Sequence, residues 1–305
     1  MKLIIVIAVS LVVWPCLSFS QEPRSYIGKT VLVTGASTGI GRKIAERLAT
    51  DGYYVFAGAR KDSDIAALSS IKNVQGIRLD VTSVQDITAA VETVRKAKRG
   101  LYAVINNAGV FSVGGVANTS MDEFDLVMAV NVAGPFRITK AFLPMIIADK
   151  GRIVTIGSVT GFLGCADANA YCMSKNAMEA FTDGLADEVA QFGVQVSVIE
   201  PGSFKSQIWM SAAKRGDVDR KTAEQWTSEQ KDPEEVASAT ALALSEKVPK
   251  RRYLVASNQL EAKIVLSSEI TRLVQSNEGQ AYTYDRQDVV AILDEALARS
   301  RPRKK

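Results

Sequence analysis

Residues 30–41 read TVLVTGASTGIG, and this stretch decides the fold of the chain. Its first four residues are a short, largely β-branched run, which is typical of a buried strand. Gly35, Gly39 and Gly41 follow, and apolar residues then recur at helical spacing over residues 42–51. A glycine-rich turn between a strand and a helix lets backbone N–H groups approach a pyrophosphate at the helix N-terminus. We therefore expect a dinucleotide site here. The alternative, glycines that serve only a turn, fits this context poorly.

The same alternation continues along the chain. Further strand-like runs occupy residues 53–59, 74–79, 101–105, 152–156, 194–199 and 253–255. Helical patterns occupy residues 84–98, 120–147, 170–191 and 233–245, and Ser120 with Glu123 forms a capping box at the start of the second. Strands that alternate with helices predict a parallel sheet covered on both faces. We expect an α/β fold with a doubly wound (Rossmann) sheet of about seven strands, in a single domain over residues 26–260.

Two segments lie outside this domain. Residues 1–20 begin with Met1-Lys2, continue as an apolar run and end in small residues, which is typical of a secretory signal peptide or an uncleaved membrane anchor. A signal peptide predicts export to a periplasm or out of the cell. An anchor predicts association with a membrane such as the endoplasmic reticulum, where the domain could also lie on the cytoplasmic face. Residues 261–305 predict two helices joined at residues 277–279, followed by a basic tail that is either solvated or in contact with anionic lipid.

The composition excludes several kinds of chemistry. The 305 residues include no histidine, which rules out Ser-His-Asp and Cys-His catalysis and histidine-ligated zinc. Cys16, Cys165 and Cys172 lack metal-ligand spacing, so we expect no metal site, no disulfide framework, and buried thiols at positions 165 and 172. The net charge of +4 is mild, and we expect no nucleic-acid partner. Catalysis must use other groups.

The end of the second strand predicts which dinucleotide binds. An acidic residue there would hold the ribose 2′-hydroxyl of NAD, but the sequence reads Gly58-Ala59-Arg60-Lys61. Two cations favour a 2′-phosphate, and therefore NADP, with NAD still possible. The alternative is that Arg60 and Lys61 are ordinary surface charges.

Tyr171 and Lys175 are the candidate catalytic pair, because residues four apart share one face of a helix. A free tyrosine has a pKa of about 10. A neighbouring ammonium ion and an oxidised nicotinamide would favour the phenolate, so Tyr171 could act as a general acid and base. Ser158 follows the strand over residues 152–156, at the edge where doubly wound folds bind ligands. Asn131 lies in an apolar helix, where an amide is costly without a partner.

With these motifs the chain resembles the short-chain dehydrogenase/reductase family, in its compact single-domain branch, over about residues 28–256. The resemblance implies that the 80–81 pair contacts adenine, that residues 106–109 close the fourth strand over the cofactor, and that residues 201–206 lie beside the nicotinamide. The cofactor-binding residues it implies are Gly35, Ser37, Thr38, Gly39, Ile40, Gly41, Arg60, Asp80, Val81, Asn107, Ala108, Gly109, Tyr171, Lys175, Pro201, Gly202 and Ser206.

The resemblance also implies a catalytic tetrad of Asn131, Ser158, Tyr171 and Lys175. Ser158 would polarise the substrate carbonyl, and Lys175 would bind the nicotinamide ribose and lower the tyrosine pKa. Asn131 would hold a water molecule between Lys175 and solvent. Homo-oligomers are expected, as in other members.

Substrate choice is expected in segments 110–118, 161–169 and 204–226, the last of which carries apolar residues of a lid. We expect a lipophilic secondary alcohol or ketone, or a primary alcohol or aldehyde, of steroid, retinoid or hydroxyacid type. Two other functions remain open. One is a catalytically quiet NADP-binding sensor or interaction protein. The other is an epimerase or dehydratase, whose larger C-terminal domain is missing from this sequence.

Overall fold

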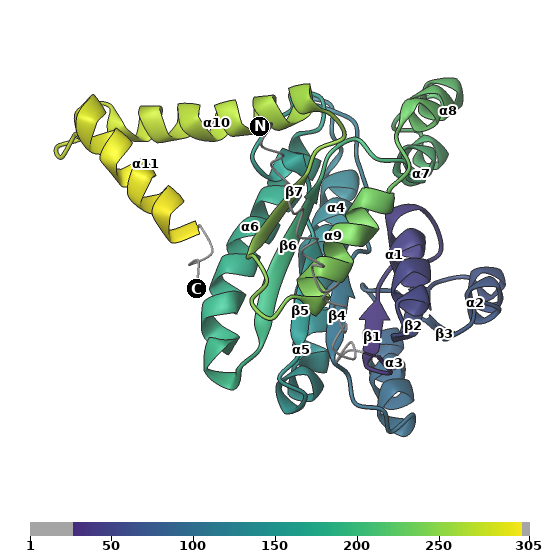
Figure 1. The fold of residues 1–305 in the computed structure, drawn as a ribbon. Coiled ribbons are helices and arrows are strands. Elements are labelled where there is room, and N and C mark those ends of the chain that lie inside the picture. The colour runs from purple at the N-terminus through teal and green to yellow at the C-terminus, as the bar shows by residue number, and fades with distance from the viewer. Residues whose placement is uncertain (1–26, 301–305) are drawn as a thin grey trace, which may run out of the picture.

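The computed structural model describes residues 27–300 and centres them on a parallel sheet of seven strands (Figure 1). The strands run in the order β3-β2-β1-β4-β5-β6-β7, and every neighbouring pair is parallel. Their bounds are Thr30–Val33 (β1), Tyr54–Ala59 (β2), Val74–Arg78 (β3), Ala103–Asn106 (β4), Arg152–Ile156 (β5), Gln195–Pro201 (β6) and Arg252–Val255 (β7). The prediction of a doubly wound sheet is confirmed.

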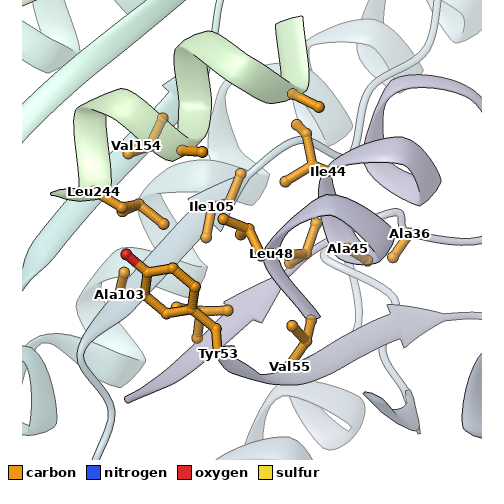
Figure 2. Packing of buried hydrophobic residues seen from close by; sticks show 14 of the residues in the cluster. Ala36, Ile44, Ala45, Leu48, Tyr53, Val55, Ala103, Ile105, Val154 and Leu244 are labelled. Carbon is orange, nitrogen blue, oxygen red and sulfur yellow. The ribbon is translucent and has the colours of Figure 1, made fainter. Parts of the chain in front are cut away.

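Helices cover both faces of this sheet. One face carries α1 (Gly39–Thr50), α2 (Asp62–Ser69) and α9 (Glu234–Ser245), and the other carries α3 (Val84–Lys96), α4 (Met121–Asn131), α5 (Ala133–Ala148) and α6 (Asn169–Val189). Successive side chains of β1 alternate between the two cores: Val31 and Val33 pack under α1 and α9, and Leu32 packs under α3 and α5. Figure 2 shows the first core, where Ile44 and Leu48 of α1 lie over the sheet.

The order of the strands places the ligand crevice. From β1 the chain builds β2 and β3 on one side, and then crosses to build β4 on the other side. The loops after β1 and β4 therefore leave the sheet in opposite directions, and ligands of doubly wound folds bind at this switch point. The glycine loop, residues 106–109 and Ser158 all follow the carboxyl ends of strands, so they lie at the same edge.

The helix predicted over residues 120–147 is broken, and this part of the prediction is wrong. α4 ends at Asn131 and α5 begins at Ala133, with Val132 between them at φ −111° and ψ −62°. Pro135 explains the break, because it has no N–H to donate to the carbonyl oxygen of Asn131 and its ring crowds that carbonyl. The short helix α2 was not predicted, since its only buried residue is Leu68 and it shows no helical periodicity.

The remaining helices lie outside the sheet layers. They are α7 (Ile208–Arg215), α8 (Arg220–Glu229), α10 (Gln259–Asn277) and α11 (Arg286–Ser300), with short 3-10 turns η1 (Val159–Gly161) and η2 (Ala190–Phe192). α10 extends away from the domain and α11 turns back from its far end (Figure 1). The helical extension predicted after residue 260 is therefore present, with its turn at residues 278–285.

One described segment, Met121–Ala148, is long and apolar enough to cross a membrane. Its residues Ile138, Phe142 and Ile146 are buried against the sheet, so α4 and α5 are core helices of this domain. The predicted signal peptide or anchor over residues 1–20, and the end of the basic tail, lie outside the described residues.

Candidate active site

The glycine loop is shaped by its contact with the segment that follows β4. Gly35 has φ +62°, and a Cβ atom there would lie 2.8 Å from the Cα of Ala108. A Cβ at Gly41 would lie 2.2 Å from Nδ2 of Asn107. Ser37 and Thr38 form the outer part of the loop, and Thr38 caps α1 without a side-chain hydrogen bond. The first N–H groups of α1 therefore remain available to an anion.

Asn107 fastens this loop to the end of β4. Its Nδ2 donates to the carbonyl oxygens of Thr34 and Gly35, at 2.8 and 3.1 Å. The backbone N–H groups of Asn107 and Ala108 both donate to Oγ1 of Thr34, at 2.9 and 3.0 Å. Ile40 packs against the core from the first turn of α1. The two walls of the crevice are thus held at a fixed separation.

The residues predicted to meet the adenosine lie together beyond the end of β2. Nη1 of Arg60 is 3.8 Å from Oδ2 of Asp80, and the Arg60 side chain is 72% exposed. Asp80 accepts hydrogen bonds from the N–H and hydroxyl of Thr82, at 2.8 and 2.7 Å. Burial opposes ionisation of Asp80, but the Thr82 bonds and Arg60 outweigh it and hold the pKa of this carboxyl below its usual value. Val81 is buried against Gly134.

Three of the four predicted catalytic residues meet at the carboxyl end of β5. Ser158 caps η1, where its Oγ accepts from the N–H of Thr160 at 3.1 Å, and its hydroxyl lies near enough to Tyr171 to lower the pKa of that phenol. Lys175 lies one turn along α6, with Nζ 5.6 Å from the centre of the Tyr171 ring. The same Nζ donates to the carbonyl oxygen of Ile156 at 2.9 Å.

Asn131, the fourth residue, braces the site from behind. Its Nδ2 donates to the carbonyl of Val110 at 2.8 Å and to Oγ of Ser174 at 3.0 Å, while its Oδ1 accepts from the N–H of Val110 at 2.8 Å. Gly109 lies between this amide and the lysine: a Cβ there would be 3.4 Å from Oδ1 of Asn131 and 4.0 Å from Nζ of Lys175. The amide therefore joins residues 109–110 to α6.

Burial governs the ionisation of the central pair. It raises the pKa of Tyr171 above its ordinary value, and the hydrogen bond with Ser158 only partly opposes this effect. It lowers the pKa of Lys175 to about 8, against the attraction of Glu179. The sequence predicts that a neighbouring ammonium ion and an oxidised nicotinamide favour the phenolate. In the protein without cofactor, desolvation of the phenolate is the largest effect on the Tyr171 pKa.

A row of aromatic rings in tilted and edge-on contact begins at Tyr171. The ring of Phe111 lies 4.6 Å from that of Tyr171 and 4.3 Å from that of Trp209, and Trp226 lies a further 4.6 Å beyond Trp209. Segments 110–118 and 161–169 are also joined, because the N–H of Gly114 donates to the carbonyl of Asp167 at 2.8 Å. The three segments expected to choose the substrate therefore meet over the catalytic tyrosine.

The turn after β6 is held by a residue that sequence reasoning missed. Glu261, in the first turn of α10, accepts from the N–H of Ser203 at 3.0 Å and from the N–H of Ser257 at 2.6 Å. Its carboxylate fills the space beside Gly202, directly after Pro201. Ser206 then returns to the glycine loop, where a Cβ at Gly39 would lie 3.0 Å from the Cα of Ser206. Glu261 three residues after Asn258 could have been identified as part of a helix cap, but not as a ligand of this turn.

The cysteines agree only partly with the prediction. Cys172 is buried among Phe111, Ala168 and Tyr171, as expected, whereas Cys165 is partly exposed at the edge of this cluster. Both thiols are free.

Comparisons with known proteins agree with this architecture. The family model described as short chain dehydrogenase matches residues 29–216. The mitochondrial D-beta-hydroxybutyrate dehydrogenase of Rattus norvegicus is 38% identical over 197 residues, 61% of this chain and 57% of that protein. Retinol dehydrogenase 5 of Mus musculus is 36% identical over 184 residues, 58% of this chain and 57% of that protein. The chain thus matches a little over half the length of these curated relatives.

A solved structure extends the likeness further along the chain. A short-chain dehydrogenase from Streptomyces avermitilis superposes with a TM-score of 0.70 at 30% sequence identity, covering 84% of this chain and 99% of that one. The family match contains the glycine loop, Asn131, Ser158, Tyr171 and Lys175, and it spans more than half of the sequence. The chain belongs to the short-chain dehydrogenase family.

Proposed function

We propose that the protein is an NADP(H)-dependent oxidoreductase that interconverts a secondary alcohol and a ketone, or a primary alcohol and an aldehyde. The observation that carries this proposal is the convergence of Ser158 and Lys175 on Tyr171, at the strand edge beside the glycine loop. Membership of the short-chain dehydrogenase family supports the class of reaction. The names of the relatives, which are dehydrogenases of hydroxybutyrate and retinol, support it too.

The crevice fits a nicotinamide dinucleotide. The uncapped N-terminus of α1 suits a pyrophosphate, and the exposed guanidinium of Arg60 suits a 2′-phosphate. The turn over residues 201–206 leads back to Gly39, where it would hold the nicotinamide. The bound cofactor would supply or accept the hydride. These features favour NADP, although Asp80 beside Arg60 leaves NAD as a second candidate.

The residues of the chain supply the proton. Burial keeps Tyr171 protonated, which suits a donor to the carbonyl oxygen of a ketone, and the hydroxyl of Ser158 would hold that oxygen by a hydrogen bond. In the direction of alcohol oxidation, the ammonium group of Lys175 would stabilise the phenolate. Pro135 leaves the carbonyl of Asn131 without a helical donor, so this carbonyl is free to hold a water molecule that returns protons.

The cover over Tyr171 favours a lipophilic substrate. Phe111 places an apolar ring against Tyr171, and Trp209 and Trp226 continue this apolar cover behind it. A hollow of about 510 Å³ adjoins Trp209 and Trp226, but the rest of its lining is polar, so the preference for a lipophilic substrate is inferred from the rings and not from this hollow. We propose a carbonyl of steroid, retinoid or hydroxyacid type, in agreement with the names of the relatives.

The test is a panel of ketones and aldehydes offered to the full chain with NADPH, followed by fluorescence of the nucleotide. Apolar carbonyls should be reduced, and Tyr171→Phe should lower turnover by roughly 10²- to 10⁴-fold while leaving NADPH binding intact. Tyr282→Phe, a change of the same kind at a position 82% exposed, is the matched control. Full turnover by Tyr171→Phe would sink the mechanism. Binding without any turnover would favour a quiet NADP-binding protein, and activity on polar sugars alone would exclude the lipophilic class.

We also propose that the protein forms homo-oligomers and that the segment over residues 1–20 brings it to a membrane or exports it. Leu266, Ile270, Ile292 and Leu293, on α10 and α11, are about half exposed, and such an apolar surface supports further association. The molar mass from light scattering, in detergent and without it, tests the oligomer. Fractionation of cells that express the full chain, with N-terminal sequencing, tests the segment.

A further inference from the structure

We propose that Glu179 and Glu200 form a buried carboxyl pair that shares one proton, and that the charge remaining on Glu179 keeps Lys175 protonated. Both glutamates are then positioning residues of the active site. The pair is a property of the protein without cofactor, whereas its effect on catalysis rests on the proposed function.

The two carboxyl groups meet at the guanidinium of Arg252, next to the catalytic residues. Glu179 follows Lys175 by one turn of α6, so both side chains occupy the same face of the helix. Glu200 projects from β6, and the side chains of Glu179 and Glu200 are 10% and 3% exposed. Both carboxyl groups lie within 4 Å of Nε of Arg252, yet Oε1 of each lacks a hydrogen-bond donor among the residues that the structure describes. An ionised carboxylate can only accept, so a proton between the two groups satisfies both.

Arg252 decides which glutamate carries the charge. Its Nε is 3.0 Å from Oε2 of Glu179 and 3.6 Å from Oε1 of Glu200, so the guanidinium favours ionisation of Glu179 first. Burial raises the pKa of Glu200 to about 8, and the negative charge of Glu179 adds to this effect. Near neutral pH, Glu200 therefore keeps the proton.

Charged groups of both signs surround the pair. Asp183 of α6 lies 2.7 Å from Arg252. Arg251, the residue before β7, pairs with Asp183 and Asp187 at 3.6 and 2.9 Å. Lys175, Arg251 and Arg252 then oppose Glu179, Asp183 and Asp187. Glu269 of α10 also faces Glu200 and disfavours a second negative charge there. A fully ionised pair would place two buried negative charges against the single guanidinium of Arg252, which is costly.

Glu179 acts on two parts of the catalytic centre: it packs against the turn that carries Ser158, and its charge attracts Lys175. A Cβ at Gly157 or Gly161, on either side of Ser158, would lie 3.2 or 3.1 Å from Oε1 of Glu179. The carboxylate thus packs against the turn that holds Ser158. Burial alone depresses the pKa of Lys175, and the attraction of Glu179 opposes this depression. Loss of that charge makes the lysine give up its proton at a lower pH.

Infrared spectroscopy of the cofactor-free protein tests the pair directly. Wild type at neutral pH should show the carbonyl band of a protonated carboxyl group, which moves in deuterated water. Glu200→Gln should lack this band, and Glu188→Gln, the same change on the exposed side of α6, should keep it. Absence of the band from wild type, or its persistence in Glu200→Gln, would overturn the shared proton. This result does not depend on any substrate.

The coupling to Lys175 is tested by the pH dependence of NADPH binding, read from nucleotide fluorescence. Affinity for NADPH should fall at alkaline pH in wild type, as Lys175 loses its proton. In Glu179→Gln this fall should begin at a pH about one unit lower. Above that pH the variant should bind NADPH roughly tenfold more weakly than wild type, and at acid pH the two should bind it about equally. Glu179→Asp keeps the charge and should restore the wild-type profile. A merely structural role would weaken binding equally at every pH. An unshifted profile in folded Glu179→Gln would refute the coupling even if no carbonyl substrate were found.

Discussion

The guanidinium of Arg215, at the end of α7, binds the carboxylate of Glu123 in the first turn of α4, with Nη2 3.0 Å from Oε1. The same group bonds Asp217 at 2.9 Å and the carbonyl oxygen of Phe111. These contacts tie the helix that carries Trp209 to the body of the domain. They therefore hold the aromatic cover closed over Tyr171.

Breaking this tie should loosen the cover. Arg215→Ala leaves two partly buried carboxylates without a partner, a cost of about 1–3 kcal/mol. We expect a melting temperature lower by roughly 2–4 °C for each kcal/mol, a red-shifted tryptophan emission, and a KM for the carbonyl substrate that rises more than kcat falls. Arg220→Ala removes an 81% exposed arginine from the neighbouring helix and serves as the control. An unchanged KM and emission would show that Arg215 does not hold the cover.

Arg60 should set the preference between the two dinucleotides. Arg60→Ala removes a charged contact to a 2′-phosphate and should weaken NADPH binding by roughly 10- to 100-fold, with NADH binding little changed. Isothermal titration with both nucleotides measures the difference. Arg95→Ala, a 64% exposed arginine on α3, is the matched change. Equal losses for NADPH and NADH would place the 2′-phosphate elsewhere.

Gly41 should accept no side chain. In Gly41→Ala the new methyl group would meet Asn107 and the carbonyl of Gly35, at 2.2 and 2.5 Å in the present geometry. We expect a loss of about 1–3 kcal/mol of stability together with weaker dinucleotide binding, because the bonds of Asn107 must shift. Gly184→Ala has open space within α6 and should instead gain about 0.5–1 kcal/mol. Urea titrations of both variants check the contrast, which a neutral Gly41→Ala would refute.

Lys175 should lower the stability of the cofactor-free protein near neutral pH. Burial lowers its pKa from 10.5 to about 8, so between these values the unfolded chain binds more protons and stability rises with pH. Lys175→Met, which buries no charge, should be more stable than wild type near pH 7, and the gap should shrink across that window as wild type loses its buried charge. Urea titrations at several pH values measure the gap. A gap that widens with pH would show instead that the folded protein raises the pKa of Lys175 above 10.5, and would refute the destabilising burial of its charge.

The sequence was sufficient for the fold because its signals are local. Buried parallel strands read as continuous apolar runs, and the glycine loop between β1 and α1 marks the first crossover. Ser158, Tyr171 and Lys175 could also be identified from the sequence. Ser158 follows the end of a strand, and Tyr171 and Lys175 share one face of a helix. Asn131 was identified as a costly buried amide, and its bonds to Val110 and Ser174 supply the partners that this argument required.

Other features depend on distances that no local pattern records. Arg215 and Glu123 are 92 positions apart, and nothing in either segment indicates that they meet. The Glu179–Glu200 contact joins a helix to a strand in the same way. The net shift of the Tyr171 pKa in the cofactor-free protein could not be predicted from the sequence either, because it depends on how completely Phe111 and its neighbours exclude water. The break after Asn131 was foreseeable from Pro135, but the apolar pattern runs through it without interruption.

The hydrogen bonds that Glu261 accepts from Ser203 and Ser257 have a practical consequence for C-terminal truncation of this protein. A gene cut at residue 260, where the strand-and-helix pattern ends, would delete the carboxylate that holds the backbone of Ser203 and Ser257. It would also remove Val265, which is only 3% exposed, and so expose the surface against which this side chain packs. The hydrogen bond from Ser268 to the carbonyl oxygen of Phe162 would be lost as well. The shortest useful expression product therefore ends after the third turn of α10, and the outer half of that helix and α11 are the parts that can be removed.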